Sequence, residues 1–152
     1  MAIAPELMST RKLPQPLRQL VIDRAKGCCE YCLCQAQFSP DPFSIEHIVP
    51  QSKGGSDLAE NLAFSCQGCN GHKHTAIKAI DPISGESTAL YNPRIHQWDD
   101  HFVWDENYSM IVGCTAIGRA TVERLQLNRT GVVNLRRVLR KLNRHPPVRS
   151  RL

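Results

Sequence analysis

The sequence predicts an α+β fold in which short strands and helices surround one small core. Three features of the 152-residue chain predict it: two distant C-x₂-C pairs, a strand-like run between them, and two runs of helical periodicity near the C-terminus. A chain of this length suits a single domain with a core of its own. Hydrophobic residues make up 41% of the chain, which excludes a disordered tail.

The first expected element is a short helix within "PLRQLVIDRAKG". Pro16 fits the first turn of a helix, and Gly27 fits its C-terminal cap. Leu17, Leu20 and Val21 share one face at helical spacing, so we expect this helix to pack on the core. The preceding residues lack a basic segment followed by a long apolar run, so we expect no signal peptide.

The middle of the chain is expected to contain a strand, a loop and a second helix. "DPFSIEHIVP" has the β-rich character of a strand, and Pro50 would end it. The following "QSKGGSD" is rich in turn residues and is expected to be a loop. "NGHKHTAIKAI", residues 70–80, is expected to be helical, and "DPISGES" would end that helix.

The last third of the chain predicts a hairpin and two helices. "HFVW" and "YSMIVG" flank the polar turn "DEN", which is typical of a hairpin. "GRATVERLQLN" and "VVNLRRVLRKLNR" are expected to be helices separated by Thr130 and Gly131. In the second helix an apolar stripe has the basic residues largely opposite it. The stripe consists of Val132, Leu135, Val138, Leu139 and Leu142.

The seven cysteines fit metal ligands better than disulfides, because their number is odd, the chain is long and no export signal is visible. Cys29 and Cys32 form one C-x₂-C pair, and Cys66 and Cys69 form the other. Four thiolates from two such turns complete a tetrahedral zinc site, which would be closed and therefore structural. Cys28 could replace Cys29 through C-x₃-C spacing, and buried cysteines without a metal are the alternative interpretation.

The segment around the two pairs resembles the HNH endonuclease family. The resemblance rests on "CEYC", "IEHIVPQSKGG" and "ENLAFSCQGCNGHK", which occur in this order over residues 28–78. It implies a ββα-metal nuclease core held together by cysteine pairs of this kind. We therefore expect that core at residues 28–80, with the N-terminal helix of residues 1–27 packed on it. Residues 81–152 would form a hairpin and basic helical extension of the same domain.

The resemblance also implies roles for four residues. His47 matches the first histidine of the family, the general base, and a neutral imidazole can accept a proton near pH 7. Glu46 stands where the family places a metal-binding acid, commonly Asp. Asn61 matches the central asparagine, which braces the loop and orients the histidine. Asn70 matches the third position, where many relatives carry His, so the chain would be an H-N-N variant. Without the motif, His47 would be interpreted as a packed histidine, Glu46 as a surface carboxylate and Asn61 as a turn residue.

A second metal site is expected beside the general base, formed by Glu46, Asn70 and His74. His74 follows Asn70 by four residues and so shares its helical face, whereas His72 points elsewhere. An oxygen-rich set with open positions suits Mg²⁺, and a histidine ligand would also admit Mn²⁺, Ni²⁺ or Zn²⁺. Lys73 fits the family's "N-x-x-K" ending and is expected to contact a phosphate; a solvated lysine is the alternative.

Positive charge is concentrated near the C-terminus. The net charge is +5, and from Arg124 to Leu152 there are nine Lys or Arg and no Asp or Glu. This asymmetry indicates a polyanionic partner, for which we expect DNA, although a merely solvated basic face is the alternative. The residues expected to contact the phosphate backbone are Arg136, Arg137, Arg140, Lys141 and Arg144.

Together these features predict a metal-dependent endonuclease that hydrolyses DNA phosphodiester bonds, with a structural Zn²⁺ and a catalytic Mg²⁺ or Mn²⁺. The alternatives are a zinc-knuckle module that binds nucleic acid without cutting it and a zinc-stabilised protein-interaction domain. No apolar run approaches the ~18–20 residues of a membrane span, so no membrane association is expected. Thiolate ligands indicate a reducing, cytoplasmic location. "LYNPRIHQWDDHFVW" and "IVGCTAIGRATVERLQLN" are similar to an extension found in a bacterial subset of HNH proteins.

Overall fold

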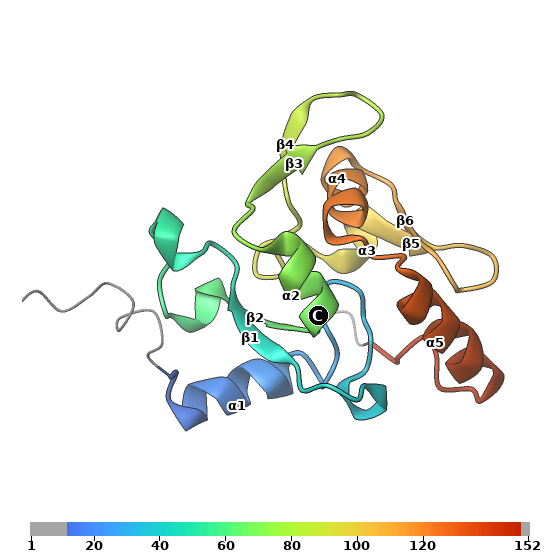
Figure 1. Ribbon diagram of the computed structural model, residues 1–152, viewed down its shortest axis with the longest axis horizontal. Helices are drawn as coiled ribbons and strands as arrows, with labels where there is room; N and C mark the ends of the chain where they lie inside the picture. The colour runs from blue at the N-terminus through green and yellow to red at the C-terminus, as the bar shows by residue number, and fades with distance from the viewer. Residues whose placement is uncertain (1–11, 150–152) are drawn as a thin grey trace, which may run out of the picture.

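A computed structural model of the chain, drawn in Figure 1, describes residues 12–149. Within this range five α-helices and three two-stranded antiparallel sheets confirm the α+β prediction. In chain order they are α1 (Gln15–Arg24), β1 (Ser44–His47), β2 (Leu62–Ser65), α2 (Gln67–Lys73), β3 (Lys78–Ile80), β4 (Ser87–Ala89), α3 (Trp98–His101), β5 (Phe102–Trp104), β6 (Ile111–Gly113), α4 (Ala116–Leu125) and α5 (Thr130–Lys141). The predicted absence of a signal peptide concerns mainly residues 1–11, which lie outside the described range.

Helix α1 forms where the sequence predicts it. A proline occupies its first turn, and Gly27 beyond its end has a φ of +70°, a backbone conformation that favours glycine. Val21 is fully buried and packs with Leu62 and Phe64 of β2. Leu20, however, is 49% exposed, so its assignment to the buried face was wrong.

Strands β1 and β2 pair so that Ile45 lies opposite Phe64 and Glu46 opposite Ala63. Because neighbouring strand residues point to opposite faces, Ile45 and Phe64 join the cluster with α1, whereas Glu46 faces Lys73 of α2. Accordingly α1 and α2 lie on opposite sides of this sheet in Figure 1. Strand β1 ends at His47, three residues before the proline that was expected to stop it.

The helix predicted over residues 70–80 was wrong in its bounds. Helix α2 begins at Gln67, because the Cys66 sulfur caps it by accepting a bond from the backbone N–H of Cys69, and it ends at Lys73. Residues 78–80 instead form β3, which pairs with β4. The intervening turn is fixed by Asp81, whose carboxylate accepts bonds from two backbone N–H groups of the turn and from Arg119 of α4.

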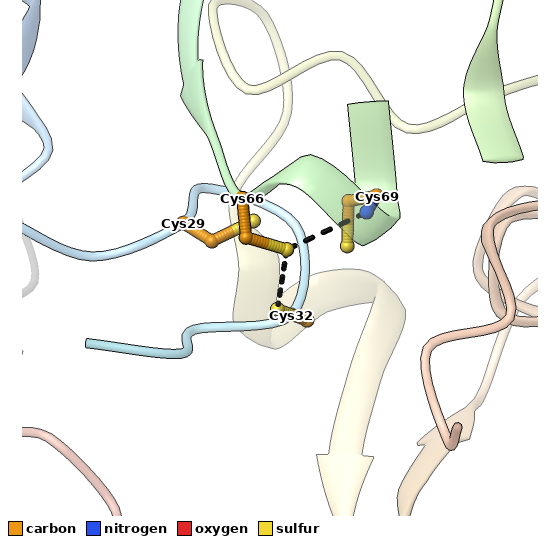
Figure 2. A group of neighbouring side chains, drawn as sticks. All are labelled: Cys29, Cys32, Cys66 and Cys69. Atoms are coloured by element: carbon orange, nitrogen blue, oxygen red, sulfur yellow. Dashed lines mark hydrogen bonds between the residues drawn. The ribbon is translucent and has the colours of Figure 1, made fainter. Parts of the chain in front are cut away.

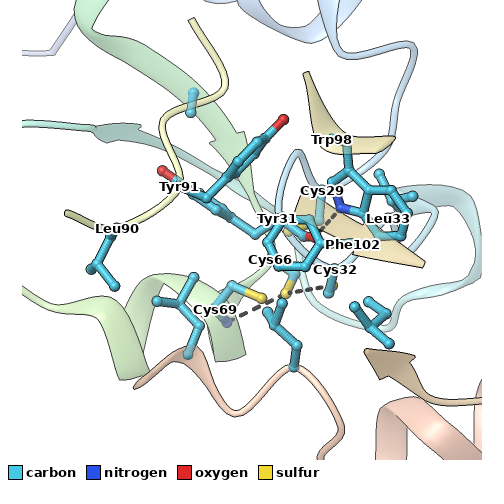
Figure 3. Close-up of a cluster of buried hydrophobic side chains, with 14 of the residues drawn as sticks. Cys29, Tyr31, Cys32, Leu33, Cys66, Cys69, Leu90, Tyr91, Trp98 and Phe102 are labelled. Carbon is cyan, nitrogen blue, oxygen red and sulfur yellow. Dashed lines mark hydrogen bonds between the residues drawn. The ribbon is translucent and has the colours of Figure 1, made fainter. Parts of the chain in front are cut away.

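The hairpin β5–β6 and the helices α4 and α5 were predicted, and the hairpin and α4 share a core with the cysteine segment. Phe102 and Leu125 belong to the same buried cluster as Cys29 and Tyr31, part of which Figure 3 shows. The expected boundary at residue 80 therefore does not separate two hydrophobic cores. Within residues 12–149, no helix has the length and apolar content that a membrane span requires.

The buried face of helix α5 differs from the predicted apolar stripe. Val138 and Leu142 are 56% and 63% exposed, so their assignment to the buried stripe was wrong. The buried positions are Val133, Arg136 and Leu139. Arg136 takes a core position because its guanidinium donates to backbone and side-chain oxygens of the neighbouring loops. These acceptors are the carbonyls of Ser109 and Leu127 and Oδ1 of Asn128.

Candidate functional site

Two segments bring four cysteine sulfurs together beside α2. Cys29 and Cys32 lie in the loop after α1, whereas Cys66 precedes α2 and Cys69 lies in its first turn (Figure 2). All four sulfurs lie within 4.8 Å of one another, and those of Cys32 and Cys66 are 3.7 Å apart. The spacing therefore predicted the correct four. The remaining cysteines lie outside the group: Cys28, Cys34 and Cys114.

The donor set of this cluster fits zinc. Four thiolates complete a tetrahedral Zn²⁺ site and leave no position for substrate, as in structural sites. All four side chains are buried, and none of the seven cysteines forms a disulfide. Burial raises the pKa of the Cys29 thiol well above its usual value, so uptake of a cation would displace protons from the cluster.

A second group of polar side chains lines an open cleft of about 250 Å³ at the end of β1. Its lining residues come from β1, from the loop after β1, and from the second half of α2 and the residue that follows it. They are Ile45, Glu46, His47, Pro50, Gln51, Asn70 and His74. The cleft thus brings together four of the residues predicted from the sequence. Glu46 and His47 both reach it although strand neighbours alternate, because β1 ends at His47.

His47 is held at its Nε2 atom, which lies 2.7 Å from Oδ1 of Asp57. Gln51 donates to the same carboxylate oxygen at 2.9 Å. A carboxylate accepts, so in this contact the Nε2 atom of a neutral His47 carries the hydrogen, and its Nδ1 atom keeps a lone pair. The sequence reasoning missed Asp57. The available signal was an acid in the "GGSD" loop, which the chain folds back towards β1.

Glu46 is buried and already partnered on both oxygens. The Tyr31 hydroxyl donates to Oε1, and the Lys73 ammonium lies 3.3 Å from Oε2. Lys73 also donates to the carbonyl of Ile48 at 2.8 Å. Burial raises the pKa of the Glu46 carboxyl, while Lys73 and Tyr31 act in the opposite direction. Lys73 is only 1% exposed, so the prediction that it contacts a phosphate was wrong.

Asn61 braces the loop that follows β1. Its Oδ1 accepts from the backbone N–H of Val49, and its Nδ2 donates to the carbonyls of Val49 and Ser56. Gly55 makes this close approach feasible, because a Cβ there would lie 1.7 Å from the Val49 carbonyl oxygen. The amide therefore fixes both ends of the loop that carries Gln51 and leads to Asp57.

The residues predicted as catalytic metal ligands, Glu46, Asn70 and His74, all line the cleft. Among residues 12–149, the only three or more His, Cys, Asp or Glu whose ligand atoms lie within 4.8 Å of one another are the four cysteines. His74 lines the cleft and His72 does not, as predicted. The prediction that His74 shares a helical face with Asn70 was wrong, however, because α2 ends at Lys73. His74 is the C-terminal cap of the helix and has a φ of +50°.

The predicted basic surface is only partly present. Arg136 is 4% exposed, so the prediction that it binds DNA was wrong. The guanidinium of Arg140 packs over the Tyr108 ring at 4.1 Å. The remaining predicted residues of α5 and its C-terminal end are exposed: Arg137, Arg140, Lys141 and Arg144.

Known proteins match part of this chain. Residues 29–76 match the family model of the HNH endonucleases. An alignment of 67 positions, which covers 41% of this chain, shows 30% identity to the type IV methyl-directed restriction enzyme EcoKMcrA of Escherichia coli (strain K12) and covers 24% of the length of that enzyme. No solved structure matches. Residues 29–76, which match the family model, contain both cysteine pairs and the cleft residues from β1 and α2. Residues 29–76 therefore form a domain of the HNH endonuclease family.

Proposed function

We propose that this chain is a metal-dependent endonuclease that hydrolyses DNA, with His47 as its general base. The supporting observation is the single cleft that Glu46, His47, Asn70 and His74 line within the segment matching the family. A base, an oxygen-rich metal site and an open space for a phosphate are the requirements of phosphodiester hydrolysis. The relative's description as a restriction enzyme agrees with DNA as the substrate.

In this proposal the Nδ1 atom of His47 accepts a proton from the attacking water. The water oxygen bonds to phosphorus, the P–O3′ bond breaks, and the leaving oxygen takes up a proton from solvent. The products are a 5′-phosphate and a 3′-hydroxyl. Asp57 is a positioning residue, because its bond to Nε2 keeps the imidazole in one tautomer and one orientation. Asn61 holds the loop between them.

Glu46, Asn70 and His74 would hold the catalytic cation. They offer a carboxylate, an amide oxygen and an imidazole, a mixed set that fits Mg²⁺ or Mn²⁺ with positions left for phosphate and water. When bound, such an ion supplies positive charge beside the scissile phosphate and the leaving oxygen. Lys73 offsets the charge of Glu46, so the substrate phosphate has to supply much of the negative charge around the ion.

Nicking of supercoiled plasmid with Mg²⁺ or Mn²⁺ tests the proposal. We expect His47→Ala to fold, retain zinc and bind DNA, but to nick more slowly by ~10²-fold or more, the usual effect of removing a general base. Asp57→Asn should slow nicking in the wild-type chain and have no further effect in His47→Ala, because it acts through His47. Full activity of His47→Ala would refute the assignment, and a wild type that binds without nicking would favour the non-catalytic module.

We also propose that the exposed basic residues of α5 bind the DNA backbone. Arg137→Glu with Lys141→Glu should weaken binding to all sequences alike and reduce the log–log salt slope by about one or two. Lys12→Glu with Lys78→Glu is the matched control, because it removes the same charge from exposed positions outside α5. Equal affinities and salt slopes of the two double variants would exclude a specific role for α5.

The expected location is the cytoplasm of a bacterium. The seven cysteines without disulfides and the similarity to an Escherichia coli enzyme support this proposal.

A further inference from the structure

We propose that Arg129, in the link between α4 and α5, is an outer partner of the cysteine cluster and couples the C-terminal extension to its metal. Its two terminal nitrogens reach two different sulfurs. Nη1 donates to Cys69 at 3.7 Å, and Nη2 donates to Cys66 at 3.6 Å. This contact joins residues separated by about sixty positions in the chain and does not depend on the proposed nuclease activity.

The guanidinium is fixed from its other side by the end of α4. Nη1 also donates to the carbonyls of Leu125 and Gln126, at 3.0 and 2.9 Å. These carbonyls belong to the last turn of the helix, where acceptors have no partner within the helix itself. One side chain therefore joins the C-terminal end of α4 to the two thiols at the start of α2.

The negative charge of the metal-loaded cysteine cluster explains why a positively charged side chain lies beside it. Four thiolates around a divalent ion carry a net charge of −2, and a buried charge is costly unless it is paired. Arg129 supplies one positive charge in direct contact. Arg136 supplies a second nearby, where it lines a small cavity together with Cys32 and Cys34. Both arginines come from the extension and not from the segment that matches the HNH family.

Gly68 provides the space for this contact. It lies inside α2 between the two thiols, and a Cβ there would lie 2.6–2.7 Å from Nη2, Cζ and Nε of Arg129. The guanidinium thus lies flat against the helix where a side chain is missing. Gly71, in the same helix, has no atom within 4 Å of the corresponding position. The two glycines differ in their relation to Arg129, which provides a matched pair of substitutions.

The experiment measures zinc affinity of the full-length protein by competition with a chromogenic chelator. We expect Arg129→Gln to lower zinc affinity by about 10-fold or more, within the range typical for outer partners of metal ligands. Gly68→Ala should have the same effect by displacing the guanidinium, while Gly71→Ala should bind zinc as the wild type does. In the Arg129→Gln background, Gly68→Ala should cause no further loss, because its target has gone.

A spectroscopic readout separates this role from a general loss of packing. In the Co²⁺-substituted protein, the sulfur-to-metal charge-transfer bands should shift in Arg129→Gln and Gly68→Ala and stay unchanged in Gly71→Ala. The far-ultraviolet circular dichroism of each metal-loaded variant checks that α4 and α5 persist. Wild-type affinity within twofold for Arg129→Gln, identical behaviour of the two glycine variants, or a wild type that binds neither ion would overturn the inference.

Discussion

Helix α2 serves two sites of opposite design, one at each end. At its start, Cys66 and Cys69 complete a buried cluster in which four identical donors lie within 4.8 Å of one another. At its other end, Asn70 and His74 face an open cleft whose carboxylate, Glu46, is already paired with Lys73. The first arrangement can hold an ion without any substrate, so its ion belongs to the fold. In the proposed function the second would need ligands from water and substrate, so its ion would take part in the reaction.

The largest expected effect follows from breaking the closed site. Cys69→Ser should release zinc and largely unfold the core, because the free energy of structural zinc binding, about 10–16 kcal/mol in small zinc-finger peptides, is also folding free energy. Cys69 is fully buried among the apolar residues of the main cluster. Zinc content per chain and a thermal melt measure the effect. Cys114→Ser is the control, because Cys114 is exposed and outside the group. One zinc per chain and an unchanged melt in Cys69→Ser would contradict the assignment.

A smaller but still large effect is expected from the ion pair behind the open site. Lys73→Met should destabilise the protein by about 3–5 kcal/mol, because it leaves the carboxylate of Glu46 buried without its counter-charge. The side chains of Lys73 and Glu46 are 2% and 3% exposed, so water does not replace the lost partner. Urea unfolding of the zinc-loaded protein measures the difference.

The control for this prediction is the double variant Lys73→Met with Glu46→Gln, which removes both charges together. It should regain much of the stability lost by the single variant. A loss of less than about 1 kcal/mol in Lys73→Met would show that the pair behaves like an exposed surface salt bridge.

The closed site was predictable from the sequence because its ligands recur at a regular spacing. Two C-x₂-C turns can present four sulfurs to one ion whatever surrounds them, and the structure selects Cys29 over Cys28 as the spacing favours. The positions of His47, Asn61 and Asn70 were likewise available from the order of motifs. What the motifs could not supply were the partners of these residues. Asp57 contacts His47 across 10 positions of chain, and Tyr31 contacts the neighbouring Glu46 across 15, through a tertiary arrangement that no local pattern encodes.

Two of the errors share a physical cause, which is that charged residues were assumed to face solvent. Lys73 and Arg136 are both buried, because each finds oxygen acceptors inside the protein. Burial of Arg136 also turned α5 away from the register that its apolar residues alone would favour. The helix expected over residues 70–80 failed differently. The tight turn fixed by Asp81 and the pairing of β3 with β4 outweigh the helical propensity of its second half.

The smallest expected effect distinguishes the two exposed histidines at the end of α2. His74 lines the cleft and His72 does not. We expect His74→Gly to raise the metal concentration needed for half-maximal nicking by about tenfold, the lower end of the usual range for residues around a metal. Glycine is chosen because His74 has a φ of +50°, which alanine would adopt only with strain. His72→Ala should behave as the wild type.

The choice of ion sharpens this last test. Imidazole is a better ligand for Mn²⁺ than for Mg²⁺, which prefers oxygen donors and retains its waters. If His74 binds the ion directly, His74→Gly should impair nicking with Mn²⁺ more than nicking with Mg²⁺. If His74 only shapes the cleft, the two ions should be affected equally. Zinc content should be unchanged in both histidine variants, because the closed site at the start of α2 does not use these residues. A larger loss for His72→Ala than for His74→Gly would reverse the assignment of the two histidines.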